Sequence, residues 1–299
     1  MNGNNQALLV GSPDSLVHAV ARRFQSLGLP STPISDVTEA LGVLHDGSVI
    51  TFIAIDEALG ETAASDVLAA AKTLYPESPV LWIGPVGDPG RFSSYAPDSI
   101  MPPTSSAHAV ERTGELLLRE VFYPNVLVDA FSQSLKTVLR GSFDVNANID
   151  DIYLRSNRNV LSFVNTLLPF AGKKVSGRLA VSSSLLYLKS VHKRIFGADV
   201  PATIEDAEDI AAEMCNQTLG TLKVFLARRG LTVESGLPMM IRGQQAEIRY
   251  KATHPALVFR LEEPQGTLFF EAYFDIFNAA ELRRPISEDL VVPGVVVSL

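Results

Sequence analysis

The sequence predicts two successive domains, an α/β domain built on a parallel sheet and an α+β domain with a mostly antiparallel sheet. The chain has 299 residues, which is enough for two ordinary hydrophobic cores. Its first third alternates apolar strand patterns with amphipathic helix patterns, and its last third contains paired strand patterns rich in Tyr, Phe and Val. We therefore expect one domain over residues 1–120 and another over residues 121–299.

Strand and helix patterns alternate regularly through the first domain. An apolar strand at residues 6–12 precedes an amphipathic helix at residues 13–29. Residues 48–56, SVITFIAID, form a continuous apolar run, which is typical of a strand buried on both faces. A helix and a second buried strand follow at residues 64–85, and residues 98–122 contain a short strand, a Pro-Pro turn and a long helix. Parallel strands need such crossovers, so the order predicts a parallel sheet covered on both faces.

The pattern changes from about residue 123. Residues 124–141 read as a helix that ends at Gly141, whereas residues 143–170 are mixed and give no clear assignment. Residues 174–184 predict a strand that leads directly into a helix at residues 185–197. After a further helix, residues 247–277 contain Tyr- and Phe-rich strands separated by EEPQG, which predicts a hairpin in an antiparallel sheet.

Composition and charge exclude several classes of protein. The net charge is −8, and no cluster of Lys or Arg offers the footprint that nucleic-acid binding needs. No apolar stretch approaches the ~20 residues that cross a bilayer, so no membrane partner is expected. The single cysteine, Cys215, cannot form a disulfide within the chain, which favours a reducing, cytoplasmic location. The first ten residues lack the features of a signal peptide.

One predicted helix carries an unusual row of residues. Residues 208–220 read EDIAAEMCNQTLG, and winding them as a helix sorts them into two sides. The core side carries Ala211, Cys215, Leu219, Leu222 and Leu226. The other side carries what we call the motif line: Asp209, Glu213, Asn216 and Gly220. Glycine weakens a helix interior, so its presence in this row needs a reason beyond helix formation.

The first domain resembles a response-regulator receiver domain over nearly its whole length. Asp56 ends the third strand, where that family carries its phosphoacceptor. The rest of the receiver site differs: Gly11 and Ser12 replace two acidic metal ligands, Gly84 replaces a hydroxyl residue, and Pro102-Pro103 replaces Lys-Pro. Phosphoryl transfer depends on a metal and cationic groups to neutralise charge. We therefore expect a degenerate, flavodoxin-like receiver with Asp56 as a vestigial phosphoacceptor position.

The second domain resembles the CheX/CheC family of chemotaxis phosphatases, in its CheX-like branch, over residues 123–277. The motif line matches that family's D-x-x-x-E-x-x-N-x-x-x-G helix. Three further segments support the resemblance: VSGRLAVSSS before a helix, SGLPMMIRG after the motif helix, and GTLFFEAYFDI as the closing strand. CheC-type members carry a second E-x-x-N on the earlier helix, where this chain has Asp129 and Ser132, so we expect one site per chain.

The resemblance implies hydrolysis of the aspartyl phosphate on a partner receiver, with Asn216 and Glu213 as catalytic residues. A carboxamide both donates and accepts hydrogen bonds, so Asn216 can orient the attacking water without a special pKa. Glu213 is expected to pair with the active-site lysine of the CheY-like partner, and Gly220 to leave room for the partner's backbone. Asp209 is expected to support the same face. Mg²⁺ belongs to the partner, so this chain is expected to bind no cofactor or metal of its own.

Alternative functions remain open on the sequence. The chain could be a non-catalytic adaptor that captures a receiver, or the acidic first domain could cover the motif helix within the chain. The degenerate receiver could equally serve dimerisation, and the resemblance implies a homodimer. The motif line could also be an ordinary solvated helix face. Five scattered histidines have no metal-ligand spacing, and Cys215 on the core side is expected to be structural.

Overall fold

The computed structural model describes residues 5–85, 92, 95–146, 148–156, 161–243, 254–276 and 282. The chain divides into two compact units, Met1–Phe122 and Tyr123–Leu299. Among the described residues, no helix is both long enough and apolar enough to cross a membrane.

The first unit is an α/β layer structure around a parallel sheet. Its elements are β1 (Gln6–Val10), α1 (Val17–Ser26), β2 (Ser31–Ile34), α2 (Val37–His45), β3 (Ile50–Asp56), the 3₁₀ turn η1 (Glu57–Leu59), α3 (Glu61–Leu74), β4 (Val80–Ile83), β5 (Ser99–Met101) and α4 (Ala107–Phe122). The strands lie in the order β2-β1-β3-β4-β5, and all pairs are parallel. This is the flavodoxin-like strand order of receiver proteins, as predicted.

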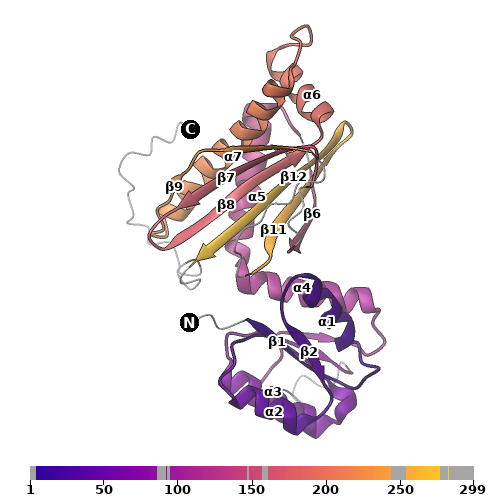
Figure 1. Ribbon diagram of the computed structural model, residues 1–299. Coiled ribbons are helices and arrows are strands. Elements are labelled where there is room, and N and C mark those ends of the chain that lie inside the picture. Colours follow the sequence, from indigo (N-terminus) through magenta and orange to yellow (C-terminus); the bar gives the residue numbers. More distant parts are fainter. Residues whose placement is uncertain are drawn as a thin grey trace. The chain divides into compact units, whose positions relative to one another are not determined.

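Helices cover both faces of this sheet. Figure 1 shows α1 and α4 on one face and α2 and α3 on the other. The apolar run of β3 is almost wholly buried, which confirms the prediction of a strand with no solvent face. Arg23 of α1 pairs with the nearly buried Glu115 of α4 at 3.0 Å, which ties the two helices of one face together.

In the described part of the second unit, three helices pack with an antiparallel sheet. Its elements are α5 (Asn125–Phe143), β6 (Asn148–Arg155), β7 (Val164–Ala171), β8 (Val175–Ser183), α6 (Leu185–Phe196), α7 (Ile204–Ala227), β9 (Glu234–Ser235), β10 (Met239–Arg242), β11 (Ala256–Glu263) and β12 (Gly266–Ile276). The strand order is β10-β7-β8-β12-β11-β6, with β9 beside β7, and every described pair is antiparallel. The α+β prediction is confirmed.

The helices α5 and α7 cover one face of this sheet (Figure 1). Phe131 of α5 packs against Phe259 of β11, with their ring centroids 4.7 Å apart. The predicted hairpin is present, since Glu263 pairs with Gly266 across a two-residue connection. The predicted strand–helix junction is also present: Ser184 caps α6 by accepting a hydrogen bond from the Tyr187 backbone amide at 3.2 Å.

The end of α5 differs from its prediction. The helix was expected to stop at Gly141, but it continues to Phe143 and ends at Asp144, which has a left-handed backbone with φ of 50°. Phe143 is buried, and burying an aromatic side chain contributes roughly 1.5–3 kcal/mol. That gain exceeds the ~1 kcal/mol that a glycine costs inside a helix, so the helix passes through Gly141.

Candidate functional site: the exposed face of α7

The helix α7 is strongly defined at its start. Thr203 and Asp206 form a capping box, in which the Thr203 hydroxyl accepts from the Asp206 amide at 3.1 Å and the Asp206 carboxylate accepts from the Thr203 amide at 2.7 Å. The Thr203 amide and hydroxyl both donate to the Asp206 carboxylate, and these hydrogen bonds hold the pKa of Asp206 below its usual value. Reciprocal capping satisfies two amides that a helix start otherwise leaves unpaired. The helix then runs for 24 residues.

One side of α7 is buried, as the spacing predicts. All five residues expected on the core side are buried: Ala211, Cys215, Leu219, Leu222 and Leu226. The Cys215 thiol lies 4.0 Å from the Thr166 carbonyl of β7, and burial raises its pKa far above the ordinary value. A thiol that stays protonated in a closed core is a packing group, so the expectation of a structural cysteine agrees with its environment.

The opposite side brings the motif line to the surface. Asp209, Glu213, Asn216 and Gly220 are all exposed, at successive turns of one helix. At a rise of 1.5 Å per residue, the row extends over roughly 16 Å. The predicted site residues of the second unit therefore lie together on a single rigid element, which presents an amide between two carboxylates and a glycine.

Glu213 has a neighbour that the sequence reasoning missed. The Gln217 side-chain amide donates a hydrogen bond to Glu213 Oε1 at 2.8 Å. The four-residue spacing of the two residues was a signal available in the sequence, since side chains at i and i+4 meet on a helix. Among the described residues, the Asn216 side chain makes no hydrogen bond, so its donor and acceptor both face solvent.

Gly220 is not required by the packing of this chain. A Cβ added at this position would meet no atom within 4 Å. The backbone of α7 is also helical there, so neither crowding nor a positive φ explains the glycine. Gly220 lies on an open surface, and a side chain at this position would prevent another molecule from approaching the helix backbone closely.

The corresponding position on α5 offers no second site of this kind. Asp129 is exposed, but the Ser132 hydroxyl donates to the Val128 carbonyl at 2.8 Å within its own helix. Ser132 thus satisfies itself locally, as serine in a helix commonly does.

Asp56, the expected vestigial phosphoacceptor position, lies in a closely packed environment. Asp56 ends β3 and is nearly buried, and its carboxylate accepts a hydrogen bond from the Ala58 amide at 2.9 Å. Glu57 accepts a hydrogen bond from the Trp82 indole at 3.1 Å, and a Cβ at position 84 would clash with both of those side chains. Glu57 and Trp82 therefore fill the space beside Gly84, the position at which the resemblance led us to expect a hydroxyl residue.

The space beside Gly11, where the resemblance led us to expect an acidic ligand, is closed in a similar way. A Cβ at Gly11 would lie 2.7 Å from Ser15 Oγ and from Val17 Cγ2. Ser15 is held there because its hydroxyl accepts from the Val17 amide at 3.1 Å, at the start of α1. Across the described residues of the chain, no group of three or more His, Cys, Asp or Glu side chains is arranged to hold a metal ion.

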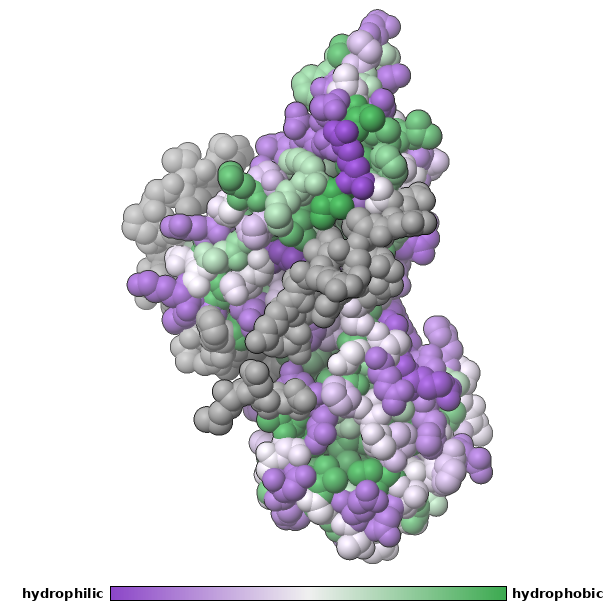
Figure 2. Space-filling view, in the orientation of Figure 1, coloured by the Kyte–Doolittle hydropathy of each residue, from purple (hydrophilic) through white to green (hydrophobic). Residues whose placement is uncertain are grey.

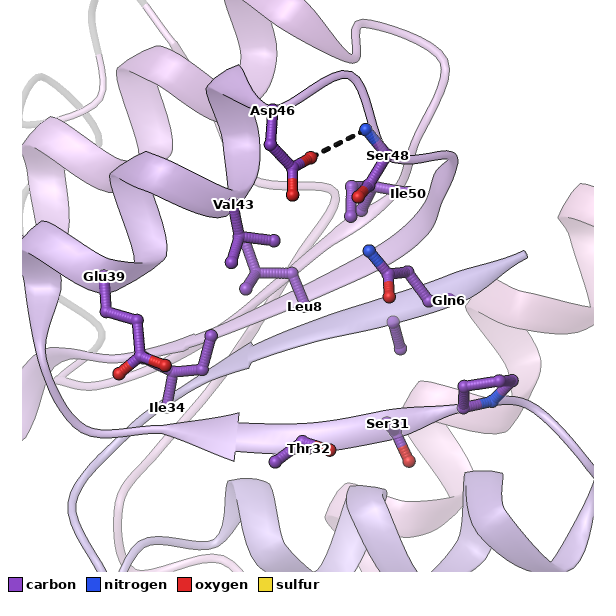
Figure 3. Close-up of a pocket in the computed structure, with 12 residues that line it drawn as sticks. Gln6, Leu8, Ser31, Thr32, Ile34, Glu39, Val43, Asp46, Ser48 and Ile50 are labelled. Carbon is purple, nitrogen blue, oxygen red and sulfur yellow. Dashed lines mark hydrogen bonds between the residues drawn. The ribbon is translucent and has the colours of Figure 1, made fainter. Parts of the chain in front are cut away.

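The first unit also contains a cavity of about 270 Å³ between its sheet and α2 (Figure 3). It is lined by apolar side chains such as Leu8 and Val43 and by the carboxylates of Glu39 and Asp46. Asp46 accepts from the Ser48 amide at 2.8 Å, and its hydrogen bonds to Ser48 lower its pKa. Much of the lining comes from residues at the starts of strands, whereas ligand sites of such sheets lie at the carboxyl ends.

Solved structures resemble each unit separately. CheX from Desulfovibrio desulfuricans is 20% identical, covering 50% of this chain and 99% of that one, with a TM-score of 0.46. A chain in a CheX–CheY–BeF₃–Mg²⁺ complex from Borrelia burgdorferi is 18% identical, covering 49% of this chain and 96% of that one, with a TM-score of 0.41. A CheY-like receiver domain protein from Methanospirillum hungatei is 12% identical, covering 39% of this chain and 95% of that one, with a TM-score of 0.34. No curated protein matches the chain by sequence.

A family model supplies the clearest relationship. The model described as chemotaxis phosphatase CheX matches residues 164–262. The matched range runs from β7 nearly to the end of β11 and contains the whole of α7 with its motif line. The chain therefore carries a CheX-like domain, preceded by a domain with the receiver-like strand order.

Proposed function

We propose that the chain is a phosphatase that hydrolyses the aspartyl phosphate of a CheY-like receiver domain on another protein. The observation that carries the proposal is the exposed motif line on α7, which lies inside the residues that match the CheX model. The receiver and its bound Mg²⁺ are the substrate. This chain contributes a docking carboxylate and a water-positioning amide.

The chemistry asks little of the phosphatase, because an acyl phosphate is already activated. The oxygen of a water molecule bonds to phosphorus, the bond between phosphorus and the aspartyl oxygen breaks, and the products are a carboxylate, inorganic phosphate and a proton. What is needed is a water held in line with the breaking bond. The Asn216 carboxamide can hold that water, since it donates and accepts hydrogen bonds and is free to face the partner.

Glu213 is proposed to fix the register of docking. Its carboxylate stands one turn before Asn216 and is oriented by Gln217. Pairing Glu213 with a lysine beside the partner's phosphoaspartate places Asn216 over the phosphorus. Asp209 adds negative charge on the same exposed face, and the bare surface of Gly220 lets the partner's backbone approach α7.

The decay of phosphorylated receivers from the same cell tests this function. We expect wild-type protein to accelerate the decay of at least one receiver, and Asn216→Ala to abolish that acceleration. Asn125→Ala, which changes an exposed asparagine at the start of α5, is the matched control and is expected to act like wild type. Binding of a receiver without acceleration of its decay would instead support the non-catalytic adaptor.

The proposal includes a homodimeric state and a cytoplasmic location. The resemblance to CheX-like domains favours a homodimer, and sedimentation equilibrium of the full chain measures it directly. The single cysteine and the proposed receiver partner favour a cytoplasmic location, which fractionation of cells checks.

A further inference from the structure

Residues 234–242, which we call the flanking segment, lie alongside α7 and run antiparallel to it. The segment contains β9 and β10 and is attached to α7 near both ends. At one end, Lys223 Nζ lies 3.3 Å from Ser235 Oγ. At the other, Arg242 donates to Glu208 Oε2 at 2.9 Å and to Glu205 Oε1 at 3.0 Å. The middle of the segment is therefore held beside the middle of the helix.

Asn216 lies in the row of α7 that faces this segment. Glu205, Asn216 and Lys223 are separated by eleven and seven residues, which is close to three and two full helical turns. The three side chains consequently project in nearly the same direction. Since the outer two bond to the flanking segment, Asn216 projects toward the same side of α7.

The flanking segment exposes apolar side chains between its two attachments. Leu237 is 85% exposed, Met239 51% and Met240 37%. Met240 is on the side of the sheet that α7 covers: its sulfur lies 3.1 Å from the Thr166 hydroxyl, and Cys215 of α7 lies against the Thr166 carbonyl. Leu237 and Met240 lie between the two attachments of this segment to α7, as Asn216 does on the helix, and we call these two residues the rim. Figure 2 shows hydrophobic residues exposed among hydrophilic ones on the visible face of the second unit.

A protein substrate that reaches Asn216 must also cover this rim. A standard protein interface buries about 800 Å² on each partner, which corresponds to a disc with a radius of roughly 16 Å. A single row of small polar residues fills only a strip of such a disc. Exposed leucine and methionine are costly in water, and methionine adapts to irregular apolar surfaces.

We propose that Leu237 and Met240 form the apolar part of the docking surface for the receiver, and contact an apolar patch beside its phosphoaspartate. This inference rests on the proposed function, because it takes the same partner and the same face of α7. The polar motif line then aligns the reacting groups, while the rim supplies affinity through burial of apolar surface. The rim is thus a determinant of KM, whereas Asn216 is a determinant of kcat.

The steady-state rate of dephosphorylation, measured against receiver concentration, tests the rim. We expect Leu237→Ser and Met240→Ser each to raise KM about five- to tenfold and to leave kcat within about twofold of wild type. The midpoint of thermal unfolding is measured for each variant, and an unchanged midpoint excludes a general loss of structure. Leu186→Ser is the matched control, because Leu186 is 81% exposed but lies on α6.

The outcomes separate this inference from the function on which it rests. If both rim variants have the KM of wild type, or lose kcat with KM unchanged, the docking role of the rim is contradicted. The proposed phosphatase activity is unaffected by that result. If wild-type protein dephosphorylates no receiver, binding is measured instead, by calorimetric titration of wild type and the rim variants with a receiver loaded with beryllium fluoride. Weaker binding by the rim variants then supports the rim without catalysis, and equal binding overturns it. A wild-type protein that neither binds nor dephosphorylates any receiver overturns both proposals.

Discussion

Gln217 donates a hydrogen bond to Glu213, one turn earlier on the exposed face of α7, with 2.8 Å between Nε2 and Oε1. The contact restricts the glutamate to a subset of its rotamers while one carboxylate oxygen remains available. Restricting a side chain in advance lowers the entropy lost when it pairs with a partner.

Gln217→Ala is therefore expected to raise KM for the receiver about two- to fivefold and to leave kcat nearly unchanged. The stability of the fold should hardly change, because Gln217 is only partly buried. Gln217→Glu is expected to raise KM further, since a second carboxylate beside Glu213 repels the Glu213 side chain. Titration calorimetry and initial rates measure both effects. A fall in kcat without a rise in KM would show that Gln217 acts on the chemistry and not on docking.

Gly220→Ala is expected to stabilise the protein and impair its activity. A Cβ there meets nothing, so the helix should gain about 0.5–1 kcal/mol in free energy of unfolding. The same methyl group stands on the surface proposed to meet the partner, so we expect at least a fivefold loss in kcat/KM. Gly141→Ala on α5 is the control, because that glycine is also helical and open. It should give the stabilisation alone, and equal activity of the two variants would remove the role proposed for Gly220.

Arg242→Met is expected to loosen the flanking segment. The Glu208 carboxylate is 10% exposed, and Arg242 is its charge partner, so removing the guanidinium leaves a nearly buried carboxylate without its charge partner. The hydrogen bonds to Glu208 and Glu205 also raise the pKa of Arg242, which keeps its guanidinium charged at any working pH. We expect a lower midpoint of thermal unfolding for Arg242→Met, with partial recovery when Glu208→Gln is added. No recovery in the double variant would contradict this account.

The stability of the second unit is expected to fall as the pH drops below about 6.5, the ordinary value for histidine. His254 Nε2 donates to the Phe274 carbonyl at 3.1 Å, and burial lowers the pKa of its imidazole. The folded state therefore binds a proton less readily than the unfolded state, and acid shifts the equilibrium toward unfolding. The loss begins near pH 6.5 and levels off below the pKa of the folded state.

Urea unfolding of the second unit between pH 8 and pH 5.5 measures this dependence. His254→Gln keeps a donor for the Phe274 carbonyl but does not titrate, so its stability should change less over that range. His45→Gln, which alters an exposed histidine of the first unit, should behave like wild type. An equally steep dependence in His254→Gln would assign the effect to other groups.

Asp56 is expected to accept no phosphate. Its carboxylate is nearly buried and caps η1, and the neighbouring positions of a receiver site are occupied by Glu57, Trp82 and Ser15. Incubation of the full chain with a small acyl phosphate and Mg²⁺, followed by intact-mass spectrometry, should show no added phosphate. A mass increase that disappears in Asp56→Asn would contradict the vestigial role of this position.

Local periodicity predicted some elements of the second unit and failed for others. The hairpin after EEPQG and the helix after Ser184 follow local rules and were predicted. The strands β6 and β7 lie in the stretch that gave no clear assignment. In β6, Asp150 and Asp151 interrupt the alternation of apolar and polar residues. The strand β7 contains Pro169, and a proline argues against a strand in the interior of a sheet.

What the sequence by itself determined is the division of α7 into a buried and an exposed side, with Glu213 and Asn216 together on the exposed one. Helical geometry relates residues three and four apart, so this information is local. Only the tertiary structure decided that Leu237 and Met240 belong to a segment attached to α7 on both sides of Asn216. That neighbourhood depends on β10 pairing with β7, where Met240 stands opposite Thr166. Pairing between distant strands is selected by the energy of the whole sheet, which no short stretch of sequence contains.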